Sequence, residues 1–86
     1  MSDNLTLQVS GDFTAAKVFV EGKVDPKGSW REIGVIDFKT LEFFEAIGAT
    51  GEYQCCVTGI EYLRINVDSV EGGSIRIFGR LTYWFS

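Results

Sequence analysis

The sequence lacks histidine and contains only two cysteines and one proline. Without histidine, the usual general base near neutral pH is missing, and neither a Ser-His-Asp nor a Cys-His arrangement can be assembled. A closed zinc site needs four ligands from cysteine, histidine or carboxylates, and two adjacent cysteines cannot both reach one ion from a regular strand. The aspartates are too scattered to resemble a calcium loop. We therefore expect a protein that is not an enzyme, with no catalytic residue, no metal and no cofactor.

Positive charge is scarce as well. Eight basic residues stand against twelve acidic ones and give a formal net charge of −4, so the surface should repel nucleic acid and anionic lipid. No stretch approaches the ~20 apolar residues that cross a bilayer. The first residues, MSDNLTLQVSG, carry no positive segment followed by an apolar run. We expect a protein made in a cytoplasm without a secretion signal, with neither nucleic acid nor membrane as its partner.

What the sequence does have is a regular alternation of apolar and polar residues, which is typical of half-buried strands. Turn residues interrupt this alternation about every 8 to 12 residues, the spacing of a β-sandwich or small barrel. With 86 residues, of which 45% are hydrophobic, the chain can build one core. We predict one domain over residues 1–86: an all-β, antiparallel β-sandwich of jelly-roll or Ig-like type with about seven short strands.

Two segments call for a closer interpretation. Asp25, Pro26 and Gly28 indicate a turn, after which residues 30–37 should return as a strand antiparallel to the preceding one. Residues 41–48, LEFFEAIG, have the composition of a short helix, but the adjacent phenylalanines and the glycines that follow favour a strand.

The adjacent cysteines, Cys55 and Cys56, lie in an alternating segment. Side chains on a strand alternate between faces, so Cys55 should point inward with Tyr53 and Val57, and Cys56 should point outward. A disulfide between neighbours would force a strained ring into the ladder. We therefore expect two thiols, one acting as a small buried apolar residue and one on the outer face.

Alternation also predicts which charged residues lie on the outer faces. Six glutamates beside apolar strand positions should be solvated: Glu21, Glu32, Glu42, Glu45, Glu52 and Glu61. Arg64, Arg76 and Arg80 alternate with the inward residues of the last two strands. They are solvated charges or pair with acidic residues across the strands, or, as the alternative, they form a small basic patch that meets an acidic surface of a partner.

Several aromatic residues are predicted to point away from the core. Phe19 and Phe78 lie between inward-facing neighbours, and the chain ends with Tyr83, Trp84 and Phe85 in a row. Aromatic residues are enriched at interface hot spots, and large apolar patches are uncommon on soluble monomers. Either a bulge or a second sheet covers Phe19 and Phe78, so that they belong to the core, or they contact a partner. The terminal aromatics are predicted to dock on a neighbouring copy or on another subunit.

Taken together, residues 16–81 resemble a group of small β-sandwich structural proteins of tailed bacteriophages and prophages. The resemblance lies in the order and spacing of short elements along VFVEGKVDPKGSWREIGVID and GEYQCCVTGIEYLRINVDSVEGGSIRIFGRL. Its residues are Val20, Glu21, Gly22, Trp30, Ile36, Asp37, Gly51, Tyr53, Val57, Gly59, Leu63, Arg64, Ile65, Gly73, Ser74, Ile75, Gly79 and Arg80. The sequence departs from the pattern at residues 26–28, at Phe43 and Phe44, and in its aromatic end.

The resemblance implies a virion protein that is not an enzyme, either a capsid decoration (cement) protein or an accessory tail protein. Its implied partners are copies of itself, with a trimer as one arrangement that fits, and a phage major capsid or tail protein. Its implied location is the virion, assembled in the cytoplasm of a bacterial host. The partner-contact candidates are Arg76 and Arg80, which would meet an acidic capsid surface, and the five aromatic residues named above.

The same order of elements also resembles discoidin-type jelly-roll modules, which bind glycans or lipid head groups through loops at one end of the sandwich. In that alternative, Trp30 would be an aromatic platform for a sugar. Since one fold serves many functions, shared topology alone accounts for this second resemblance as well.

Overall fold

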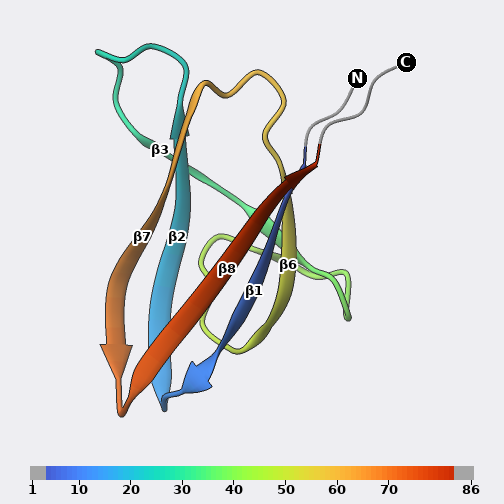
Figure 1. Ribbon diagram of the computed structural model, residues 1–86, viewed down its shortest axis with the longest axis vertical. Coiled ribbons are helices and arrows are strands. Elements are labelled where there is room, and N and C mark those ends of the chain that lie inside the picture. Colours follow the sequence, from blue (N-terminus) through green and yellow to red (C-terminus); the bar gives the residue numbers. More distant parts are fainter. Residues whose placement is uncertain (1–3, 83–86) are drawn as a thin grey trace.

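The computed structural model describes residues 4–82, which form eight β-strands and no helix (Figure 1). The strands are β1 (Asn4–Asp12), β2 (Ala15–Lys23), β3 (Arg31–Ile33), β4 (Val35–Asp37), β5 (Phe43–Phe44), β6 (Gly51–Cys56), β7 (Tyr62–Glu71) and β8 (Ser74–Thr82). Two antiparallel sheets pack as a sandwich: a five-stranded sheet in the order β5-β4-β6-β1-β8 and a three-stranded sheet in the order β3-β2-β7. The predicted all-β sandwich is confirmed.

Residues 30–37 do not form the single returning strand that the sequence suggests. The first half, β3, pairs with β2 and places Ile33 opposite Val20, whereas the second half, β4, pairs with β6 and places Ile36 opposite Gln54. The chain changes sheet at Gly34, where any Cβ would collide with the ring of Phe43. The prediction of one strand was wrong because a residue without a side chain lets the backbone pass close to that ring and leave the first sheet.

Residues 41–48 are mostly loop. Only Phe43 and Phe44 form a strand there, paired with β4, so the strand prediction holds for two residues and the helix is excluded. Beyond them, Ile47 makes an isolated bridge to Val18, with hydrogen bonds of 2.8 and 3.0 Å between their backbones. Ile47 is almost completely buried. The loop therefore contributes one anchor to the core, and this anchoring replaces a regular strand.

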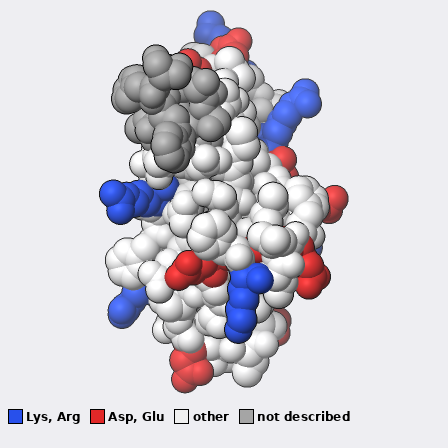
Figure 2. Space-filling model, turned by 90° about the vertical axis from the view of Figure 1, so that its right-hand side faces the viewer, with Lys and Arg blue, Asp and Glu red and all other residues white. Residues whose placement is uncertain are grey.

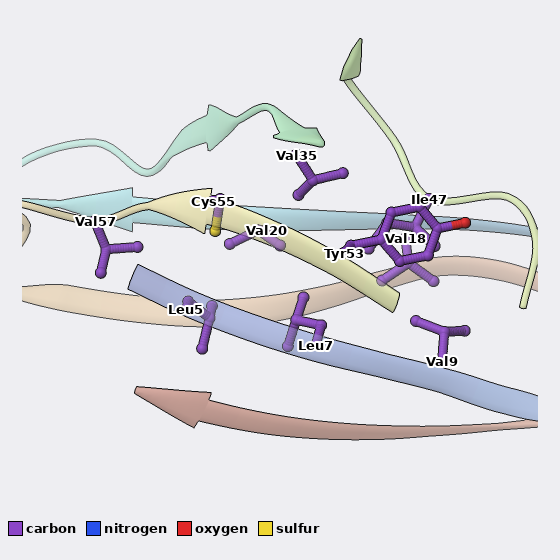
Figure 3. Close-up of a cluster of buried hydrophobic side chains, with 10 residues drawn as sticks. All are labelled: Leu5, Leu7, Val9, Val18, Val20, Val35, Ile47, Tyr53, Cys55 and Val57. Atoms are coloured by element: carbon purple, nitrogen blue, oxygen red, sulfur yellow. The ribbon is translucent and has the colours of Figure 1, made fainter. Parts of the chain in front are cut away.

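The core lies between the sheets and is made by the alternating residues (Figure 3). Its buried members are Leu5, Leu7, Val9, Val18, Val20, Val35, Ile47, Tyr53, Cys55 and Val57. β1 lies between β6 and β8 in the five-stranded sheet, so its three apolar residues have a paired strand on either side. Full burial of an aliphatic side chain contributes ~1.5–3 kcal/mol, so this cluster supplies most of the driving force for folding.

The apolar residues of β7 and β8 also point between the sheets, as their alternation predicts, but they are less covered. Ile65 lies opposite Val20 and Val67 opposite Val18 on β2, and both β2 residues are buried. Even so, 37% of Ile65 and 44% of Val67 remain exposed. Leu63, Ile75 and Ile77 are partly buried against the core. The sandwich is thus closed on one side and open on the side of β7 and β8.

Candidate functional site: surfaces for a partner

The two cysteines lie in different environments. Cys55 is buried and Cys56 is exposed, as alternation predicts, and no disulfide joins them. Burial, and next the neighbouring Cys56, raise the pKa of Cys55 to about 11, so its thiol is neutral at pH 7. Cys56 Sγ lies 3.5 Å from the hydroxyl of Thr58 in a hydrogen bond. Cys55 therefore acts as a core residue rather than as a nucleophile.

Glu21 was predicted to be solvated, and this prediction was wrong. Only 8% of Glu21 is exposed, because it lies in the middle strand of the three-stranded sheet. Its Oε1 accepts a 2.7 Å hydrogen bond from Nε of Arg64, its register partner on β7. The other five glutamates of that group are exposed, as predicted. The cross-strand alternative for Arg64 is thereby confirmed.

Trp30 is held in place by the same sheet. Nζ of Lys23 lies 4.6 Å, and Cζ of Arg64 lies 4.3 Å, from the centre of its ring. Such cation–π contacts contribute about 0.5–1 kcal/mol each at exposed sites. The ring of Trp30 therefore already contacts two cations from neighbouring strands. Its role as the platform of a glycan-binding module stays a prediction.

The three arginines do not form one patch. Arg64 belongs to the three-stranded sheet, whereas Arg76 and Arg80 lie on β8 of the five-stranded sheet. Alternation brings Arg76 and Arg80 to the same face of β8 as Phe78, which is 60% exposed. Phe19 is half-buried on β2, in the other sheet, with Nζ of Lys17 5.5 Å from its ring centre. Arg64 therefore lies apart from Arg76 and Arg80, because β7 and β8, although consecutive, join different sheets. Arg76 and Arg80 stay predicted partner contacts.

The terminal aromatics Tyr83, Trp84 and Phe85 lie outside the described residues, and their docking stays a prediction. Within residues 4–82, no three histidine, cysteine, aspartate or glutamate side chains are grouped to hold a metal ion. In the same part of the chain, no helix is long and apolar enough to span a membrane.

The hairpin of β4 and β5 carries apolar side chains whose exposure the alternation pattern did not predict. Phe38, Leu41 and Phe43 are all exposed, and Leu41, at 76%, is the most exposed large apolar residue among those described. Figure 2 looks onto the side of the molecule where β6 lies in Figure 1, and uncharged side chains form a broad area there with charged groups around it. In the sequence, this exposed surface was signalled only by Phe43 and Phe44, where the chain departs from the phage-protein pattern that it resembles.

The loop of this hairpin is held rigidly by Asp37. Its carboxylate Oδ1 accepts hydrogen bonds from the backbone amides of Lys39 and Thr40, at 2.8 and 3.2 Å, and its carbonyl accepts one from Leu41 at 2.8 Å. Leu41 itself adopts a left-handed conformation with φ of 62°. Such a conformation costs roughly 1–2 kcal/mol for a residue other than glycine. The turn therefore holds a strained leucine in solvent, a feature more typical of a binding surface than of a structural turn. We name Phe38, Leu41 and Phe43 the hairpin surface.

Comparison with known proteins shows the fold. No model of a known protein family matches this chain, and no curated protein matches it significantly. Among solved structures, it is similar to the crystal structure of the SPBc2 prophage-derived protein YomS. The TM-score is 0.77 with 21% identical residues, and the match covers 93% of this chain and 70% of that chain. The chain therefore has the β-sandwich fold of a prophage-derived protein.

Proposed function

We propose that this chain is a bacteriophage or prophage structural protein that is not an enzyme. In this proposal it is a capsid decoration (cement) protein, which binds the surface of the particle in many copies and stabilises it; an accessory tail protein is the variant. The observation that carries the proposal is the likeness of fold to a prophage-derived protein over 93% of the chain. The partners would be copies of this chain and a major capsid or tail protein, and the location would be the virion.

The surface chemistry supports a role in assembly. The hairpin surface exposes three large apolar side chains on a turn that Asp37 holds in one conformation. A preorganised apolar loop loses little conformational entropy when a partner covers it. Contacts that are modest individually give firm attachment when they repeat over a lattice. We assign the hairpin surface to attachment on the capsid or tail subunit.

To test the proposal, the gene is fused to an affinity tag at its own position in the phage or prophage genome. After induction, full heads, empty heads and tails are separated on a density gradient, and the copy number of the chain in each fraction is measured by mass spectrometry. The expected result is many copies on the heads, or a smaller fixed number on the tails. Absence from both fractions would overturn the proposal.

A matched pair of variants tests the hairpin surface in the same assay. Leu41→Ser should lower the number of bound copies severalfold. Val24→Ser changes another exposed residue, 60% accessible and outside the hairpin surface, and should leave the number unchanged. Equal binding by both variants would move the attachment site elsewhere. A glycan array on the purified chain completes the test, because specific sugar binding without particle binding would favour the jelly-roll module instead.

A further inference from the structure

An apolar groove of about 690 Å³ runs along the open side of the sandwich, between β7 and β8. β7 and β8 leave a common turn and then diverge, because β7 pairs with β2 of one sheet and β8 with β1 of the other (Figure 1). The groove is lined by Leu5, Leu7, Leu63, Arg64, Ile65, Val67, Ile75, Ile77, Gly79 and Leu81. Nearly all of these residues are apolar, so leaving them in water is unfavourable.

The edge strands of the two sheets are short on one side of the molecule and long on the other. On one side, the edge strands are β3 and β5, with 3 and 2 residues. On the groove side, they are β7 and β8, with 10 and 9 residues. Proteins commonly protect a sheet edge by keeping its strand short, and a long apolar edge pairs readily with another strand. The groove side thus offers two long edges and an apolar floor between them.

We propose that a second copy of this chain covers the groove, so that β8 of each copy lies antiparallel to β7 of the other. A two-fold axis parallel to the strands exchanges the positions of the two sheets. Each five-stranded sheet then continues into the three-stranded sheet of the second copy. The two grooves face each other and form one shared core. A contact of this kind is self-complementary, as closed two-fold dimers require.

The charges on the two strands favour this arrangement over one that pairs β8 with β8. β8 carries Arg76 and Arg80 and no acidic residue. β7 carries Asp68 and Glu71 next to the turn, and its one arginine, Arg64, lies farther from the turn in an ion pair with Glu21. Pairing β8 with itself would bring four arginines together. Pairing β8 with β7 places Arg76, which is also close to the turn, beside the acidic end of β7 of the second copy. Opposite charges on neighbouring strands stabilise a sheet and like charges destabilise it.

The proposed dimer adds to the proposed function the surface through which copies associate. Its biological purpose rests on that function, but its geometry does not. The hairpin surface stays outside the groove, so one surface remains for attachment to the particle. A solution experiment on the purified chain therefore tests the inference without any particle.

The experiment measures the mass of the full chain by light scattering after size exclusion, and its dissociation constant by sedimentation equilibrium. The wild-type chain should be a dimer. Val67→Asp should raise the dissociation constant at least tenfold, because a carboxylate in the shared core loses its water. Val24→Asp, outside the groove, is the matched control and should not change it. A monomeric wild type, a different multiple, or equal behaviour of the two variants would overturn the inference. Circular dichroism confirms that each variant is folded.

A charge exchange tests the pairing of the strands. Arg76→Glu should weaken the dimer, and Arg76→Glu combined with Asp68→Lys and Glu71→Lys should restore it. If Arg76→Glu strengthens the dimer instead, β8 pairs with β8 and the proposed arrangement is overturned.

Deletion of residues 83–86 separates the groove from the terminal aromatics. A truncated chain that remains dimeric supports the groove as the contact. A truncated chain that becomes monomeric, together with a Val67→Asp variant that remains dimeric, would overturn the inference in favour of the tail. If the chain is a dimer but does not bind phage particles, the proposed function is overturned and the dimer stands. If the chain is a monomer that binds particles, the dimer is overturned and the proposed function stands.

Discussion

Nε of Arg64 lies 2.7 Å from Oε1 of Glu21, and this ion pair joins β7 to the middle strand of its sheet. Glu21 is nearly buried, whereas about half of the Arg64 side chain, 47%, is exposed. The pair therefore differs from a surface salt bridge. If Arg64 were removed, little water could reach the Glu21 carboxylate to solvate its charge.

Removing the cation should consequently cost more than removing an exposed arginine. We expect Arg64→Leu to lower the free energy of unfolding by about 1–2 kcal/mol, less than for a fully buried pair because solvent screens Arg64. Urea unfolding measures the change, and Arg31→Leu, at an exposed arginine on β3, is the control. Glu21→Leu added to Arg64→Leu should recover part of the loss. A double variant as unstable as Arg64→Leu would show that the buried charge is not the cause.

Stability should fall at high pH because of Cys55. Burial raises its pKa from 9.0 to about 11, so between these values the thiol ionises in the unfolded chain but not in the folded one. This contribution is fully present below pH 9 and is lost as pH rises toward 11, on the order of 2 kcal/mol. Burial, and next Asp37, also raise the pKa of Tyr53, which adds a loss of the same sign.

Urea unfolding at several pH values between 8 and 11 measures this loss of stability. Cys55→Ala should remove a large part of it, while Cys56→Ala should keep most of it because burial of Cys55 is the larger cause. Equal pH dependence in the wild type and Cys55→Ala would contradict the assignment.

A side chain at Gly34 should require the ring of Phe43 to move. A Cβ there would meet the ring of Phe43, so Gly34→Ala must displace the ring or the backbone. Because Phe43 is 66% exposed, its ring can move away, and we expect a loss of at most about 1 kcal/mol, at the low end of the cost of overpacking. Gly48→Ala is the control, since the nearest neighbour of its Cβ would be the backbone oxygen of Ala16 at an ordinary 3.4 Å. Phe43→Ala should rescue Gly34→Ala; if it does not, the cost comes from the backbone conformation instead.

Leu41 should contribute to binding rather than to stability. Because glycine adopts its left-handed φ without strain, Leu41→Gly should leave stability unchanged or raise it by up to ~1 kcal/mol. The same variant should reduce attachment to the particle, since it removes the most exposed apolar side chain of the hairpin surface. Thermal unfolding and the particle assay measure the two effects. A clear loss of stability would indicate that Leu41 has a structural role.

The sequence by itself determined the fold class, the positions of the long strands and the facing of their residues. Alternation placed Cys55 inside and Cys56 outside, because neighbouring side chains on a strand must point to opposite faces. The same rule placed Ile65 and Val67 between the sheets. It gave no information on which strands become neighbours, because a period of two describes one strand at a time.

Only the tertiary structure decided which sheet each strand joins. The change of sheet at Gly34, the anchoring of Ile47 and the burial of Glu21 all depend on contacts between segments that are distant in the sequence. The groove has the same origin, because β7 and β8 are consecutive but pair with different sheets. Alternation fixes the direction of a side chain, whereas the order of strands fixes whether anything covers it, and that order depends on the packing of the whole chain.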